Sequence, residues 1–190
     1  MKALSAISNH VAAFERWLLI ACVALILALI LLNVVTRTAN ASLYWVDETA
    51  VFVMVFATFI GASLMVRKRM DFAVTLVTDM LPATARRWVQ AAVAVLTLGF
   101  ALMMIMLCWR WFDIPTLARF GFDEKAYFRE TFNAIYREKT MTTGTLKIWF
   151  LLIMPWFSLT LMVHALANLF EDLAAAVGAG EGIAHQEASL

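Results

Sequence analysis

The stretch YWVDETAVFVMVFATFIGASLMVRKR, from Tyr44 to Arg69, decides how this chain folds. Two adjacent acids, Asp47 and Glu48, lie near its start, and a basic cluster closes it. Between them, the 17 residues 50–66 carry no charge. A helix crosses the hydrocarbon of a bilayer with about 20 apolar residues, because it rises about 1.5 Å per residue. The stretch therefore predicts a membrane-spanning helix with charged residues at its ends.

The composition of the whole chain supports membrane insertion. Of its 190 residues, 63% are hydrophobic and only 15% are charged, whereas soluble domains are about half apolar and about a quarter charged. The net charge of +1 gives no reason to expect nucleic-acid binding. Cys22 and Cys108 lie inside apolar runs, without the spacing of a CxxC pair or a metal site. We interpret both as buried small hydrophobic residues.

Three further segments are long and apolar enough to cross the membrane. With the quoted stretch they give four predicted spans: 17–36, 49–66, 88–112 and 148–169. The first span continues beyond the apolar core of a secretory signal, so we interpret it as a retained helix. Backbone in lipid must satisfy its own hydrogen bonds. We therefore predict one all-α domain over residues 1–173, a four-helix bundle with an extramembrane loop at 113–145 and a disordered tail at 174–190. Pro155 is expected to bend the fourth helix.

The distribution of basic residues does not settle the orientation of the chain. Seven Lys and Arg residues lie on the side that holds both termini, and eight lie on the other side. The positive-inside rule therefore gives no decision. However, the cluster 67–69 lies directly at the membrane edge, whereas the connection between the first two spans ends in acids. This local density favours cytoplasmic termini.

The loop 113–145 contains a second helical pattern. Phe128, Phe132, Ile135 and Tyr136 recur at i, i+4, i+7 and i+8, which places apolar side chains on one face of a helix. We predict a short amphipathic helix here. It could cap its own bundle, lie on the bilayer or contact a partner.

The predicted spans lack the residue types that chemistry inside a membrane requires. Their centres contain no charged residue, and charged residues within a bilayer usually mark function. His164 lies four residues before Asn168, and we interpret it as a packed or interfacial histidine rather than a proton relay. We find no nucleophile, base or metal cluster. We therefore expect no catalysis, no metal site and no cofactor in this chain.

Small residues mark a packing face on the second span. Ala57 and Gly61 form a small-xxx-small pair, and Ala62 and Ser63 extend it. Such residues allow helices to approach closely. They predict packing within the bundle or a face for a larger membrane partner, and the two interpretations are compatible.

An ordered set of motifs runs through the first half of the chain. Its members are Arg37, Trp45, Asp47-Glu48, Gly61-Ala62, Arg67-Lys68-Arg69 and Leu81-Pro82. Their order and spacing resemble the small membrane subunit of tripartite ATP-independent periplasmic (TRAP) transporters, of the four-carbon-dicarboxylate small permease type. Two features depart from the family: Asp71-Phe72 stand where it often has a histidine and an apolar residue, and the loop before the fourth span is longer than usual. Any role of that histidine is not carried over.

The resemblance implies a non-catalytic subunit. In that family the small subunit is a scaffold for a large multi-span subunit, which carries substrate and sodium, and a periplasmic protein delivers the substrate. The resemblance thus implies a sodium-coupled transporter of organic acids in a bacterial or archaeal inner membrane, with cytoplasmic termini. Sodium is expected to bind the large subunit. The candidate partner-interface or structural residues are Arg37, Trp45, Asp47, Glu48, Ala57, Gly61, Ala62 and Arg67, with Phe128, Phe132, Ile135 and Tyr136 as a possible periplasmic contact helix.

Two other functional classes remain as alternatives. One is a small membrane enzyme or redox protein, with Asp47, Glu48, Asp71 and His164 as its candidate groups. The other is a self-contained four-span channel or carrier, against which the lack of intramembrane charge weighs. Neighbouring residues on a helix point about 100° apart, so Asp47 and Glu48 cannot share one direction. We expect one of them to face Arg37 across the short connection and the other to face water or a partner.

Overall fold

The structure is a computed structural model that describes residues 2–70 and 81–187. Four of its helices are long and apolar enough to cross a membrane, and the described residues contain no strand. The predicted all-α, four-span fold is therefore confirmed. The helices are α1 (Lys2–Thr38), α2 (Tyr44–Lys68), α4 (Ala83–Phe112), α5 (Ile114–Arg119), α6 (Glu124–Thr131), α7 (Ile148–Leu151) and α8 (Ile153–Glu187).

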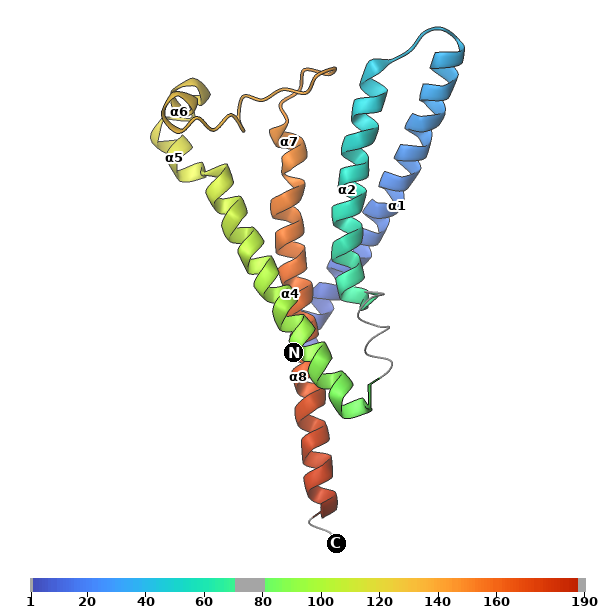
Figure 1. Cartoon of the computed structure of the whole chain (residues 1–190), viewed down its shortest axis with the longest axis vertical. Coiled ribbons are helices and arrows are strands. Elements are labelled where there is room, and N and C mark those ends of the chain that lie inside the picture. The colour runs from blue at the N-terminus through green and yellow to red at the C-terminus, as the bar shows by residue number, and fades with distance from the viewer. Residues whose placement is uncertain (1, 71–80, 188–190) are drawn as a thin grey trace.

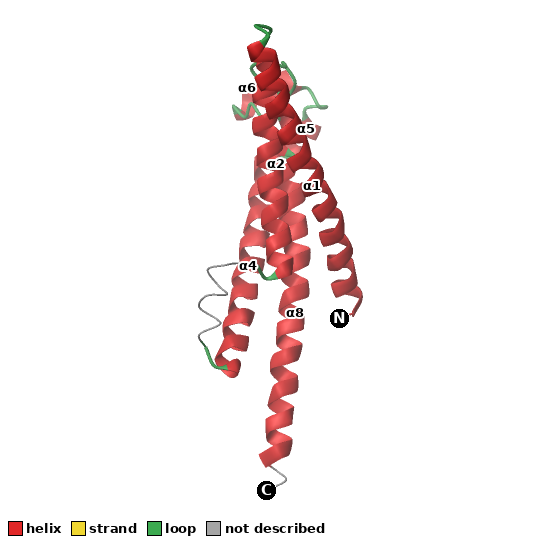
Figure 2. Ribbon diagram, turned by 90° about the vertical axis from the view of Figure 1, so that its right-hand side faces the viewer, coloured by secondary structure: helices red, strands yellow, loops and turns green. Residues whose placement is uncertain are grey.

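The long helices form two hairpins that splay apart (Figure 1). α1 packs along α2, and α4 packs along α8. α8 also contacts α2 and α1, so it is the element that joins the two hairpins. The hairpins converge at the end that holds the termini and separate toward the other end, where α5 and α6 lie (Figure 1). Figure 2 shows the N-terminal part of α1 beside α8 at this end, where Ser5 Oγ lies 2.7 Å from Glu171 Oε1.

Apolar side chains join the helices at the centre of the spans. Cys22, Ile60 and Ile153 form a buried cluster between α1, α2 and α8. Gly61 lies at the α1–α2 contact, where a Cβ atom would lie 3.9 Å from Leu19. The small-xxx-small pair therefore packs within the bundle, because Ala57 also lies against this cluster.

The outer helical segments extend beyond the predicted spans. α1 already begins at Lys2, and α8 continues to Glu187, whereas the sequence predicted disorder from residue 174. The alanine-rich start of that tail has a high helix propensity and favours continuation of the helix. A turn at Leu152 separates α7 from α8. It lies just before Pro155, whose ring nitrogen cannot donate to a carbonyl of the preceding turn.

The amphipathic helix predicted around Phe128–Tyr136 is only partly present. α6 ends at Thr131, because Phe132 adopts a left-handed conformation with φ 55°. Phe132 is 80% exposed, and the helical periodicity that linked it to Ile135 does not continue through this residue. The prediction of one continuous apolar helix face was wrong here.

The segment after α6 nevertheless caps the bundle. Ile135 is buried against Cys108 and Phe112 at the end of α4, and the hydroxyl of Tyr136 donates to the carbonyl of Phe112. Within α6 the buried residue is Tyr127. The segment was expected to cap its own bundle, to lie on the bilayer or to contact a partner. These contacts match the first alternative.

The start of α6 is fixed by an N-cap. The carboxylate of Asp123 accepts hydrogen bonds from the backbone N–H groups of Lys125 at 2.8 Å and Ala126 at 3.3 Å. These two bonds lower the pKa of the Asp123 carboxyl, since they favour its charged form. The cap therefore holds this extramembrane helix at pH values where Asp123 is ionised.

Candidate functional site

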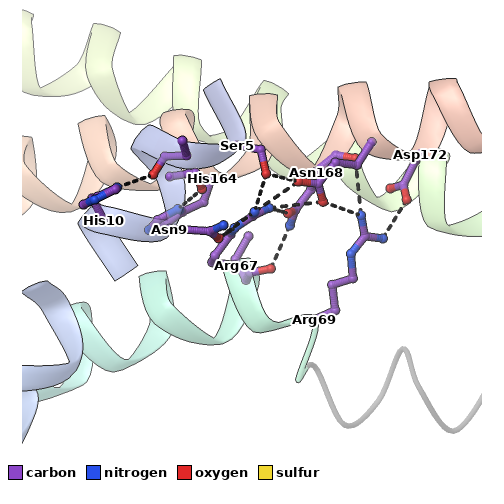
Figure 3. A network of polar contacts seen from close by, with 12 residues as sticks. Ser5, Asn9, His10, Arg67, Arg69, His164, Asn168 and Asp172 are labelled. Atoms are coloured by element: carbon purple, nitrogen blue, oxygen red, sulfur yellow. Dashed lines mark hydrogen bonds and ion pairs between the residues drawn. The ribbon is translucent and has the colours of Figure 1, made fainter. Parts of the chain in front are cut away.

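A polar network joins α1, α2 and α8 at the end of the bundle that holds the termini (Figure 3). Each of the three helices contributes side chains that bond to the other two. We call this set the three-helix network, and its members are Ser5, Ser8, Asn9 and Glu15 of α1, Arg67 and Arg69 of α2, and His164, Asn168, Glu171 and Asp172 of α8.

Arg67 is the centre of this network, and its side chain is only 9% exposed. Toward α1, its Nη2 donates to Ser5 Oγ at 3.1 Å and to Asn9 Oδ1 at 2.8 Å. Toward α8, its Nη1 donates to Asn168 Oδ1 at 2.8 Å, and its Nη2 lies 3.0 Å from Glu171 Oε1. A planar guanidinium carries five donors in a fixed fork. One side chain can therefore hold three helices in register.

Arg69 adds a second link between α2 and α8. It is the left-handed residue that ends α2, with φ 53°. Its Nη1 lies 2.7 Å from Asp172 Oδ1 and its Nη2 lies 3.7 Å from Glu171 Oε2. The basic end of α2 is thus bound to an acidic pair on α8.

His164 forms the buried part of the network. Its Nδ1 lies 2.7 Å from Ser8 Oγ, and its Nε2 lies 3.1 Å from Glu15 Oε2. All three residues are fully buried. Our interpretation of His164 as a packed histidine agrees with this position. However, the second oxygen of Glu15 is buried without a hydrogen-bond partner in the described part of the chain.

Ser8 and Glu15 were not among the predicted site residues, because both precede the first predicted span, 17–36. The sequence does contain one pattern that indicates a buried face in this segment. Ser8, Ala12 and Glu15 recur at i, i+4 and i+7, and all three are buried. This spacing marks one face of a helix, and a charged residue on such a face needs a partner.

A second polar site lies at the opposite border, between the end of α1 and the start of α2. Arg37 Nη2 lies 2.8 Å from Asp47 Oδ2, as expected across the short connection. Asn33 completes the contact: its amide donates to Asp47 Oδ1, and its Oδ1 accepts from Arg37 Nε at 3.0 Å. The Arg37 and Asp47 side chains are 62% and 49% exposed. Such a pair contributes only about 0–1 kcal/mol to stability.

Glu48 holds a turn of the extramembrane loop. Its carboxylate accepts from the backbone N–H groups of Met141 at 2.8 Å, Thr142 at 2.9 Å and Thr143 at 3.3 Å, and from the Thr142 hydroxyl. Successive backbone N–H groups form a concave anion site, which the Glu48 carboxylate occupies here. We expected the acid that does not face Arg37 to face water or a partner. It instead contacts the chain's own loop.

Part of the chain matches a known family of membrane proteins. The family model of the tripartite ATP-independent periplasmic transporters, DctQ component, matches residues 26–175. The chain belongs to the DctQ family. It is therefore the small membrane component of a TRAP transporter, as the resemblance implied. No curated protein and no solved structure matches the chain.

The matched range of this DctQ chain includes only part of the three-helix network. The α2 and α8 members lie inside residues 26–175, whereas Ser5, Ser8, Asn9 and Glu15 precede it. Both Arg37 and the acidic pair Asp47-Glu48 lie inside the matched range. The contact between Glu48 and the loop therefore lies wholly within the residues that the family model matches.

The remaining candidate residues of the DctQ chain lie on its outer surface. Trp45 is 41% exposed at the start of α2. Ala62 is exposed on the face of α2 that points away from α1. Phe128 packs edge to face against Phe132.

Asp71 lies outside the described residues. Within the described part of the chain, no group of three His, Cys, Asp or Glu residues could hold a metal ion.

Replacement of Glu48 by alanine is expected to free the turn at residues 141–143. The three backbone N–H groups would lose a charged acceptor, so their hydrogen exchange should become on the order of tenfold faster. Hydrogen exchange with mass spectrometry on the detergent-purified chain measures this change. Asp47→Ala removes the neighbouring acid and serves as the control, with protection of the turn retained. Unchanged exchange in Glu48→Ala would contradict the assignment.

Proposed function

We propose that this DctQ-family chain is the non-catalytic scaffold subunit of a sodium-coupled transporter for organic acids. In this role it holds the large membrane subunit, which binds sodium and moves the substrate, while a periplasmic binding protein delivers the substrate. The family match is the observation that carries the proposal. The orientation with cytoplasmic termini belongs to the same proposal, and it places the loop with α5 and α6 in the periplasm.

The use of polar groups within the chain supports a scaffold role. Ser63 and Thr160 lie 2.9 Å apart and link α2 to α8 within the spans. In the described residues, the buried side-chain oxygens without a partner belong to Glu15 and Asp172, both in the network at one border. The buried polar side chains named here thus form contacts between helices. A translocation path would instead need polar groups along its length.

An apolar groove supports a docking site for the large subunit. It lies between α2 and α4, with α8 as its floor, near the end where the hairpins converge. Ala62 on α2 leaves this groove wide, since its side chain is small. The lining residues are Ala62, Met65 and Val66 of α2, Leu96, Thr97 and Phe100 of α4, and Phe157 and Leu161 of α8. A transmembrane helix of the large subunit would find an apolar surface with a small residue at its centre, as helix contacts in membranes favour.

The exposed apolar residues of the loop support contact with the binding protein. Phe122 is 69% exposed, Phe132 is 80% exposed and Met141 is 95% exposed. All three belong to the loop side of the molecule. Solvent-exposed aromatic and methionine side chains are typical of protein interfaces. This surface replaces the continuous contact helix that the sequence predicted.

The proposal predicts that transport requires the whole complex. After mild detergent extraction, the chain should co-purify with a large membrane subunit in a fixed ratio. In liposomes, sodium-driven uptake of an organic acid should require the large subunit and the binding protein as well. Sodium-driven uptake by this chain alone would refute the scaffold role.

Matched variants test the groove separately. Ala62→Trp fills the groove and should reduce recovery of the large subunit, because a bulky ring prevents close helix approach. Ala28→Trp is the control, since Ala28 is an exposed alanine on α1 away from the groove. If Ala28→Trp abolishes co-purification and Ala62→Trp does not, the docking face lies elsewhere.

A further inference from the structure

A basic cleft lies between α1 and α2 at the border that holds the termini. It has a volume of about 400 Å³. Three cationic side chains and one carboxylate line it. The lining residues are Asn9, Ala12, Ala13, Arg16, Arg67, Lys68 and Glu171.

The single carboxylate of the cleft is already engaged. Glu171 Oε1 accepts from Arg67 Nη2 at 3.0 Å and from Ser5 Oγ at 2.7 Å. Glu171 Oε2 accepts from Arg67 Nη1 at 3.2 Å and lies 3.7 Å from Arg69. Glu171 therefore offsets the charge of Arg67, while Asp172, at 2.7 Å, is the nearer partner of Arg69. Among the described residues that line the cleft, no carboxylate is left to balance the other two cations.

Those two cations are Arg16 and Lys68. Both are exposed, and neither side chain forms a hydrogen bond or an ion pair within the described ranges. The Arg16 guanidinium lies 5.8 Å from the ring centre of Trp17. One cation comes from α1 and the other from α2, so they flank the cleft from its two walls. An anion in the cleft would be within reach of both.

The cleft lies at the depth of lipid headgroups. Trp17 follows Arg16 directly and is 65% exposed, and tryptophan side chains collect at the headgroup level of a bilayer. The unbroken apolar sequence of α1 starts at Leu18. On α2, the uncharged sequence ends at Val66, just before the cleft.

We propose that this cleft binds the phosphate group of an anionic phospholipid. Basic pockets between transmembrane helices suit such headgroups, and guanidinium and ammonium groups are the side chains that bind phosphate. Arg16 and Lys68 hold the phosphate, while Arg67, paired with Glu171, forms the floor of the cleft. The lipid stabilises the α1–α2 hairpin at the end where the three-helix network begins. The proposal does not depend on the transported substrate or on the large subunit.

The test compares lipid binding of the full chain and a charge variant in nanodiscs or mild detergent. Native mass spectrometry should show preferential retention of phosphatidylglycerol over phosphatidylcholine by the unmodified chain. The double variant Arg16→Gln/Lys68→Gln should retain phosphatidylglycerol more weakly, on the order of tenfold. In lipid-free detergent, helical content and thermal unfolding should stay unchanged, because within the described ranges neither side chain has a hydrogen bond or an ion pair to lose.

A matched control removes two charges at the other border. Arg119→Gln/Lys125→Gln changes two exposed cations near α5 and α6 and should leave lipid retention unchanged. Equal retention of both lipids, or full retention of phosphatidylglycerol by the Arg16/Lys68 variant, would overturn the proposal. Displacement of the lipid by millimolar inorganic phosphate, at equal affinity, would show a site for free phosphate and would also overturn it.

Discussion

Replacing His164 with leucine is expected to lower the free energy of unfolding by about 3–5 kcal/mol. His164 Nε2 is the hydrogen-bonding partner of Glu15 Oε2, at 3.1 Å, and both side chains are fully buried. The other oxygen of Glu15 has no partner in the described part of the chain. The substitution would thus leave a buried carboxylate with no group to stabilise its charge. Reversible unfolding in mixed detergent micelles, followed by circular dichroism, measures the loss.

A second substitution separates the charge from the packing. Glu15→Leu/His164→Leu removes the whole pair, and apolar replacement of a buried pair is often neutral or stabilising. The double variant should therefore regain most of the stability lost in His164→Leu. The control is His10→Leu on α1, because His10 is exposed and bonds only to the carbonyl of Ala6. A His164→Leu chain as stable as the His10→Leu chain would disprove an energetic role for the pair.

Replacing Arg67 with alanine is expected to cost about 2–3 kcal/mol, since it removes charge-assisted bonds to two other helices. Asn9 and Asn168 would each lose a donor at 2.8 Å. The effect should be smaller than that of His164→Leu, because Glu171 is 40% exposed and water can solvate it. The same unfolding measurement applies. In addition, α1 and α8 should separate at the border, so hydrogen exchange in the first two turns of α1 should rise.

Two further variants test whether the bonds of Arg67, rather than its charge alone, stabilise the bundle. Arg67→Lys keeps the charge but has no planar fork, so it should restore only part of the stability. Lys68→Ala removes the adjacent charge, which has no hydrogen bond or ion pair in the described part of the chain, and should be neutral. If Lys68→Ala destabilises the bundle as much as Arg67→Ala, then general charge at this border, rather than the bonds of Arg67, accounts for the effect.

The spans could be predicted from sequence because their signal is local. Length and hydropathy placed the second span at 49–66, inside α2, and placed the end of the third at Phe112. The Arg37–Asp47 pair was also predictable, since its members are only ten positions apart in the sequence and the short connection brings them together. Such features need no knowledge of how the helices are arranged in space.

The rest of the candidate site depends on that arrangement. Glu15 and His164 are 149 residues apart, and Glu48 and Met141 are 93 residues apart. Hydropathy predicts four membrane-spanning helices, but it does not predict which of these helices pack against one another. The loop shows a related limit. One left-handed residue, Phe132, ends α6 and redirects the chain, although the apolar spacing continues through it.

The contact of Glu48 with the loop has a mechanical consequence for the splayed hairpins. The three-helix network joins the hairpins at one end, and at the open end the loop runs from Ile135, packed on α4, to the turn held by Glu48 on α2. Phe52 of α2 also stacks on Phe150 of α7, with ring centres 3.9 Å apart. The hairpins and the loop thus form the three sides of a triangle (Figure 1). Glu48 and the Phe52–Phe150 stack together close the third side of this frame, so the angle between the hairpins depends on contacts made at the open end as well as on the three-helix network.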